Sequence, residues 1–144
     1  MDLSNNMLQG EIPPAFVELK NLTLLNLFRN KLHGAIPEFI GEMPQLEVLQ
    51  LWENNFTENI PQALSELTQS VQKLLLDGNQ FTGSIPSYIG KLQQLSKMDF
   101  SHNKLSGPIT PEISQCKLLT FVDLSRNQLS GEIPNEITAI RILN

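Results

Sequence analysis

An asparagine recurs at an almost constant interval along this chain of 144 residues. Four of the five intervals are 24 residues long and the third is 25; the positions are Asn6, Asn30, Asn54, Asn79, Asn103 and Asn127. Each asparagine follows a triplet that contains two apolar residues, and these pairs are Met1/Leu3, Leu25/Leu27, Leu49/Leu51, Leu74/Leu76, Met98/Phe100 and Val122/Leu124. A unit of this length cannot bury its apolar face alone, whereas stacked copies form one continuous core. The repeat therefore predicts a solenoid of six coils.

Each unit divides into three parts. The triplet alternates with the period of a strand, so its apolar pair is expected to face inward. A glycine-containing turn and an Ile-Pro pair follow, as in Gly34 and Ile36-Pro37, and the proline prevents a strand or helix from continuing. Apolar residues three apart, such as Ile40 and Met43, then favour a short helical or 3₁₀ return segment. Stacked units of this kind predict a parallel sheet along one side of the solenoid.

The recurring asparagines are interpreted as structural. A buried amide is costly unless backbone groups satisfy its two donors and its acceptor. Six amides at the same place in each unit are therefore expected to bond exposed backbone groups where the strands end. We assign them no functional role.

Composition and charge exclude several classes of function. Ten Lys and Arg against fifteen Asp and Glu give a net charge of −5, which argues against a nucleic-acid partner. No apolar run is long enough to span a bilayer, and residues 1–24 do not resemble a signal peptide. Cys116 is the only cysteine and occupies an inward apolar position, so no disulfide, structural zinc, other metal or cofactor is expected.

The unit LxxLxxLxLxxNxLxGxIPxxIGxL resembles the plant-type leucine-rich repeat over essentially the whole chain. The resemblance implies an α/β repeat solenoid, a right-handed superhelix with a parallel β-sheet on the concave face and short 3₁₀ or helical returns on the convex side. It also implies a second short strand near LxGxIP. We expect residues 1–144 to form a single leucine-rich-repeat domain of about six 24-residue repeats, uncapped at both ends.

Two stretches are similar to a narrower group. Residues 21–44 and 94–138 resemble extracellular repeats of CLAVATA/barely-any-meristem receptor kinases, which bind secreted CLE peptides on the inner surface of the solenoid. The resemblance implies a non-enzymatic recognition module at the outer face of the plasma membrane, with a CLE-like peptide, a co-receptor or another protein as partner. The kinase domain of such a receptor is absent from this sequence, as is the Arg-x-Arg pair by which many members hold a peptide carboxylate. The alternative is a secreted defence protein similar to polygalacturonase inhibitors; a surface-adsorbing repeat ranks last, because the rows of residues are chemically mixed.

The concave sheet is the candidate binding surface, because residues between and just after the strand leucines point outward in repeats of this kind. Phe28 and Trp52 lie at equivalent positions of neighbouring units, and exposed aromatic residues are typical of binding hot spots. Ordinary surface aromatics are the alternative. Asp99 and Asp123 also lie at equivalent positions; a cationic ligand relieves their repulsion, or both are solvated or screened by Lys97 and Arg126. The candidate ligand-binding residues are Asn26, Phe28, Arg29, Gln50, Trp52, Glu53, Asp77, Lys97, Asp99, His102, Asp123 and Arg126. No catalytic residue is assigned.

Three further features of the sequence lead to predictions. Asn21 and Asn55 begin Asn-x-Thr acceptor patterns for glycosylation. Glu58 stands where the other units have glycine, and one extra residue separates Leu67 from Leu74, so this unit should be strained or reshaped. Uncapped ends should expose apolar residues and favour end-to-end self-association, which light scattering can measure.

Overall fold

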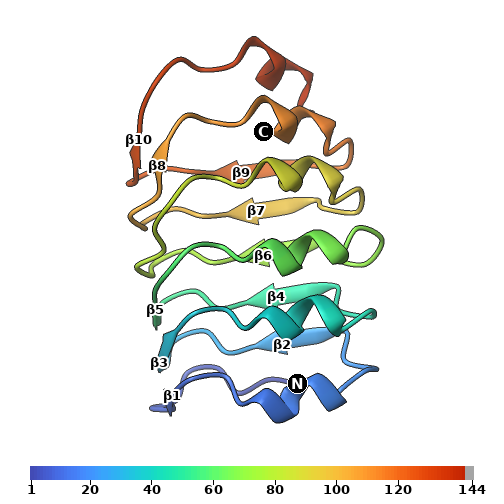
Figure 1. Ribbon diagram of the computed structural model, residues 1–144, viewed down its shortest axis with the longest axis vertical. Helices are drawn as coiled ribbons and strands as arrows, with labels where there is room; N and C mark the ends of the chain where they lie inside the picture. Colours follow the sequence, from blue (N-terminus) through green and yellow to red (C-terminus); the bar gives the residue numbers. More distant parts are fainter. Residues whose placement is uncertain (142–144) are drawn as a thin grey trace.

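The computed structural model describes residues 1–141 as six coils stacked along one axis (Figure 1). We number the coils 1 to 6 after their asparagines, Asn6 to Asn127. Each coil runs from the main sheet through a turn near its asparagine to a short outer strand or bridge, and returns through a 3₁₀ helix. This is the solenoid that the 24-residue repeat predicts.

The main sheet has five parallel strands in the order β2-β4-β6-β7-β9. Their bounds are β2 (Leu24–Asn26), β4 (Val48–Gln50), β6 (Lys73–Leu75), β7 (Lys97–Asp99) and β9 (Phe121–Asp123). Each residue of a strand pairs with the residue at the same place in the next repeat. Coil 1 joins the sheet through an isolated bridge between Asp2 and Asn26. Equivalent residues therefore form columns across the sheet.

The second strands form two separate small sheets. One contains β1 (Gln9–Gly10), β3 (Lys31–Gly34) and β5 (Asn55–Phe56), and the other contains β8 (Ser106–Gly107) and β10 (Gln128–Leu129). Coil 4 has no second strand among the described residues and joins β5's coil in this layer only through the isolated bridge from Asn59 to Thr82. The second strand that the resemblance implies is thus present in five of the six coils, and its sheet is interrupted at coil 4.

Six 3₁₀ helices lie on the side opposite the main sheet (Figure 1). They are η1 (Pro14–Glu18), η2 (Glu38–Glu42), η3 (Gln62–Glu66), η4 (Ser87–Lys91), η5 (Pro111–Gln115) and η6 (Asn135–Ala139). A proline precedes or begins each helix, because its fixed φ suits the first turn and its missing N–H has no partner to lose there. The expected return segments are confirmed as 3₁₀ helices.

Glycines set how closely neighbouring helices approach. A Cβ at Gly41 of η2 would overlap the carbonyl oxygen of Ala63 in η3, and a Cβ at Gly90 of η4 would overlap that of Glu112 in η5. The equivalent residue of η3 is Ser65, and η3 makes far fewer close backbone approaches to η4 than to η2. The helical layer is therefore less closely packed between coils 3 and 4 than between coils 2 and 3, although η5, which has Ser114 at this position, still packs closely against η6.

The asparagine column is confirmed as a ladder. Asn103, for example, donates from Nδ2 to the carbonyl oxygen of Leu76 in the preceding coil (3.1 Å) and to those of Phe100 and Ser101 in its own coil. Its Oδ1 accepts the backbone N–H of Phe81 in the preceding coil at 3.0 Å. The asparagines of coils 2, 3, 4 and 6 make the same kinds of bond. Each amide thus links two coils and satisfies backbone groups that the strand ends leave open.

The first coil departs from the expected inward packing. Met1 and Leu3 are 43% and 37% exposed, whereas the equivalent Leu25 and Leu27 of coil 2 are buried. The first pair is exposed because no coil covers it on its outer side in the described structure. Leu8 is exposed at the same end. The exposed apolar end agrees with expectation; self-association stays a prediction, and the last residues, 142–144, lie outside the described residues.

Several residues occupy the left-handed region of the backbone. Glu58 has φ of 65°, so it adopts the glycine conformation of its position despite its Cβ, and strain is the outcome at this turn. A second column, just before each ladder asparagine, is also left-handed; its members are Asn5, Arg29, Glu53, Gly78, His102 and Arg126. The sequence analysis missed this column, although Gly78 was a signal of it.

Candidate functional site: the concave sheet

Two aromatic side chains form a stack on the outer surface of the main sheet. Phe28 and Trp52 follow β2 and β4, and their ring centroids are 4.2 Å apart with an angle of 6° between the ring planes. Trp52 also donates from its indole N–H to Oε1 of Gln50 at 3.3 Å. The stack arises because equivalent positions of adjacent coils are separated by the spacing of neighbouring strands. Both rings are partly exposed and form a flat apolar platform, as their alignment in the sequence predicts.

Charged side chains border this platform. Nε of Arg29 lies 2.8 Å from Oε2 of Glu53, and the Arg29 guanidinium carbon lies 4.9 Å from the centre of the Trp52 ring. Such a cation placed against an aromatic ring is attracted by the electrons of the ring. The ion pair and the ring contact together fix Arg29 at the edge of the platform, where the sequence analysis expected it.

Asp77 continues the column of Phe28 and Trp52 into coil 4. It is partly buried, and desolvation raises its pKa to about 6 from 3.8; the negative charges of Asp99 and Glu53 add to the rise. A carboxyl group with this pKa gains a proton over a range in which ordinary aspartates stay charged. The structure therefore brings an acidic, titratable position directly beside the aromatic platform.

Asp99 and Asp123 lie side by side on β7 and β9. Each accepts the backbone N–H of a serine two residues later, and the bonds from Ser125 lower the pKa of Asp123. Lys97 Nζ lies over the Phe121 ring, 4.7 Å from its centre. Within residues 1–141, neither Lys97 nor Arg126 forms an ion pair with the two aspartates, so direct pairing is not how they are screened. His102, which follows β7, is exposed, and its Nδ1 lies 3.2 Å from Oγ of Ser101.

Asn26 requires a correction. The sequence places it on the accessible concave surface, but it is only 8% exposed. Its Nδ2 donates to Oδ2 of Asp2 at 3.2 Å, and its Oδ1 is buried with no hydrogen-bond partner among the described residues. The position does belong to the concave columns, but its neighbours cover the short side chain. Asn26 is therefore not an accessible contact residue in this structure.

The remaining candidate positions lie where the sequence places them. Asn21 and Asn55 are exposed, so both acceptor sites are accessible, and their glycosylation stays a prediction. Cys116 is 1% exposed, its thiol donates to the carbonyl oxygen of Ile89, and burial raises its pKa to about 11. This confirms Cys116 as a small buried residue of the core.

The raised pKa of Asp77 predicts a pH-dependent stability. The native state binds a proton on Asp77 more readily than the unfolded chain does, so this residue destabilises the fold increasingly as pH rises from about 4 to about 6. Asp77→Asn should therefore raise the urea midpoint near neutral pH and leave it unchanged below about pH 4. Urea unfolding at both pH values measures the difference.

Asp123→Asn is the matched control for this effect. The pKa of Asp123 is lowered in the fold, so its charged form stabilises the native state at neutral pH. At neutral pH, Asp123→Asn should therefore lower the urea midpoint slightly, whereas Asp77→Asn raises it. An Asp77→Asn midpoint that shifts equally at both pH values would show that the effect is not one of protonation.

Comparison with known proteins decides the family. The Leucine Rich Repeat family matches residues 1–19, 21–43, 45–67, 70–92, 94–116 and 118–140. The chain belongs to the leucine-rich repeat family. The six matched repeats account for nearly all of the given residues. No curated protein matches it significantly.

The solved structures most similar in these comparisons are plant receptor-kinase ectodomains. The HAESA leucine-rich-repeat ectodomain of Arabidopsis, in complex with an IDA peptide hormone that is extended at its N-terminus, is 35% identical. The match has a TM-score of 0.95 and covers 99% of this chain and 24% of that one. The GASSHO1/SCHENGEN3 ectodomain of Arabidopsis thaliana, in complex with CASPARIAN STRIP INTEGRITY FACTOR 2, is 39% identical; the match has a TM-score of 0.90 and covers 94% of this chain and 16% of that one.

A third structure, PEPR1 with AtPEP1, is 34% identical; the match has a TM-score of 0.91 and covers 99% of this chain and 20% of that one. This leucine-rich-repeat chain thus spans less than a quarter of the length of each of these three ectodomains. Across residues 1–141, no helix has the length and apolar character that crossing a membrane requires.

Proposed function

We propose that this chain is the ligand-binding part of the extracellular region of a plant receptor-like Ser/Thr kinase, and that its concave sheet holds an extended peptide. The observation that carries the proposal is the stacked pair of Phe28 and Trp52 on the open surface of the sheet. Partly exposed aromatic residues held in a fixed geometry lose little entropy on binding, which is why they are enriched in binding hot spots. The complexes of similar ectodomains with peptide hormones support this assignment.

The surface around the platform indicates what the peptide carries. An apolar or proline side chain packs on the Phe28 and Trp52 rings, and a cationic group lies over Asp77 and Asp99. Arg29 and Glu53 are already paired with each other, so they serve as a polar rim that keeps the peptide in register. Gln50, Lys97, His102, Asp123 and Arg126 provide the outer contacts of the same face. The carboxylates lie on one side of the platform and the guanidinium of Arg29 lies on the other. This separation of charge sets the direction in which the peptide binds.

The narrower proposal, which concerns the kind of peptide, rests on residues 21–44 and 94–138. Their resemblance to the CLAVATA/barely-any-meristem group supports a CLE-like peptide as the ligand. A co-receptor is a second partner of the same region, as the complex of HAESA with IDA and SERK1 illustrates for a chain 40% identical to this one. The proposed location is the outer face of the plasma membrane.

Alanine substitution of the platform tests the proposal. In calorimetric titration with a set of synthetic CLE-type peptides, Phe28→Ala and Trp52→Ala should each weaken the binding of the best peptide about tenfold. Each change removes half of an exposed stack and no core contact, so the urea midpoint should stay close to that of the parent chain.

Leu118→Ala is the control for this experiment. Leu118 is an exposed apolar residue that lies outside the strands of the main sheet. Leu118→Ala should therefore keep the affinity for the best peptide within about twofold of that of the parent chain. Binding that survives the double platform substitution would reject the aromatic site, and the absence of binding by every peptide would reject the CLE-type assignment.

A further inference from the structure

A groove lies on the helical side of the solenoid, away from the concave sheet. Its volume is about 700 Å³, and segments 35–38, 58–62 and 84–88 of coils 2, 3 and 4 line it. These segments connect the outer strands to the helices η2, η3 and η4 (Figure 1). Grooves of this volume are typical of sites that hold a small molecule or a short stretch of chain.

The groove lies beside irregularities of the third unit. One extra residue follows η3 in this unit. In the second-strand layer, coil 4 joins coil 3 only through the bridge from Asn59 to Thr82 among residues 1–141. Glu58 holds a left-handed conformation that glycine occupies in the other coils.

Its lining is mixed. The buried Ile36 and Ile60 and the rings of Pro37, Pro61 and Pro86 lie beside polar side chains, which are Asn59, Gln62, Ser84 and Ser87. Tyr88 is only 5% exposed and donates its hydroxyl to the carbonyl oxygen of Pro61 at 2.6 Å, which fixes the ring between coils 3 and 4. Such a lining of prolines and an aromatic ring suits an extended segment, and in particular a proline or aliphatic side chain.

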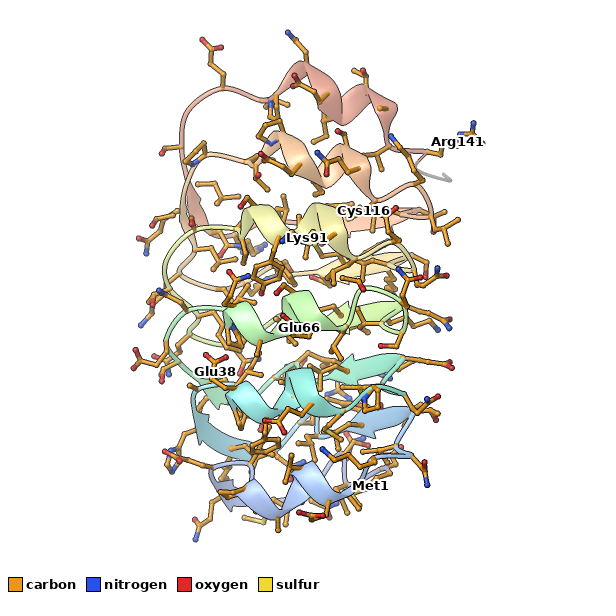
Figure 2. All side chains as sticks on the ribbon, turned by 45° about the vertical axis from the view of Figure 1, so that its right-hand side comes forward. Met1, Glu38, Glu66, Lys91, Cys116 and Arg141 are labelled. Atoms are coloured by element: carbon orange, nitrogen blue, oxygen red, sulfur yellow. The ribbon has the colours of Figure 1, made fainter. Side chains whose placement is uncertain are left out.

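Its rim is acidic. Glu38 and Glu58, both exposed, are the charged residues among the described lining, which contains no Lys or Arg. Neither carboxylate forms an ion pair within residues 1–141. Figure 2 shows Glu38 on the helical side of the stack, where Glu66 also lies on the next coil. Two carboxylates without an ion-pair partner in this part of the structure attract a cationic segment and repel an anionic one.

We propose that this groove binds an extended basic segment of a partner protein, in which Lys or Arg side chains pair with Glu38 and Glu58 and a proline or aliphatic residue packs between them against Tyr88 and the three prolines. The segment crosses coils 2 to 4 on the face opposite the peptide-binding sheet. The chain thereby engages a second partner while the concave surface is occupied.

Nuclear magnetic resonance of the ¹⁵N-labelled chain tests this second site. The probe is a capped peptide of the sequence Lys-Pro-Leu-Lys-Pro-Leu-Lys, and its counterpart replaces each lysine with glutamate. The lysine peptide should shift amide signals of segments 35–38, 58–62 and 84–88, and the glutamate peptide should not. The double variant Glu38→Gln, Glu58→Gln should weaken binding at least about tenfold, and added salt should weaken it as well.

Glu66→Gln is the control, because it removes an equally exposed carboxylate from η3 outside the groove. Its affinity for the lysine peptide should stay within about twofold of the parent chain. The proposal is overturned by any of three results: shifts centred on the concave sheet, equal loss in the control, or no shifts at millimolar peptide. Repeating the titration with Phe28→Ala and Trp52→Ala separates the two sites, since the groove should bind unchanged even if the concave site fails.

Discussion

Asn103→Leu is expected to lower the free energy of unfolding by about 3 kcal/mol, the upper end of the range for buried groups left without partners. The substitution removes the donor to the carbonyls of Leu76, Phe100 and Ser101 and the acceptor of the Phe81 N–H. These backbone groups lie where water cannot replace the amide. Urea unfolding followed by circular dichroism measures the change.

Asn6→Leu is the matched control for the ladder. Asn6 occupies the same place in coil 1, but its side chain bonds only to Leu3 and Ser4 of its own coil and is exposed. Its replacement should therefore cost less than about 1 kcal/mol. Equal losses for Asn103→Leu and Asn6→Leu would show that the bonds between coils are not the source of the stability.

Gly41→Ala is the second substitution with a large expected effect. A Cβ at this position would overlap the backbone carbonyl oxygen of Ala63, so η2 and η3 would have to move apart. Forcing atoms into a packed region costs roughly 1–3 kcal/mol, and backbone on the opposing side leaves little room for relief. We expect a loss of about 2 kcal/mol in the free energy of unfolding, measured as above.

The control is Ser114→Ala, which changes the equivalent residue of η5. Ser114 already has a Cβ, and its hydroxyl bonds only to the Pro111 carbonyl of its own helix. The expected change is within about 0.5 kcal/mol. If Gly41→Ala is equally mild, η2 and η3 do not owe their close packing to glycine.

The two proposed surfaces have different origins in the sequence. The aromatic platform uses the repeat, because Phe28 and Trp52 stack through the regular alignment of coils 2 and 3. The acidic groove includes a break in the repeat, at Glu58, which lines it. A uniform solenoid offers the same surface at each coil, so a local irregularity is a physical means of making one coil pair different from the others.

Much of this structure was predictable because a constant repeat turns positions in the sequence into columns in space. The alternation around Leu49 and Leu51 indicated the strand, and the asparagine interval indicated a ladder whose bonds the structure confirms. The stacking of Phe28 on Trp52 followed from the same spacing. These features need only the order of residues and the distance between strands.

What the sequence by itself determined, then, was the coil, its strand, its 3₁₀ return and the alignment of equivalent residues. Only the tertiary structure decided the burial of Asn26, the desolvation that raises the pKa of Asp77, and the groove across coils 2 to 4. The reason is that a repeat fixes which residues are neighbours, whereas exposure, local charge and the gap between coils depend on the sizes and directions of side chains from three adjacent coils at once.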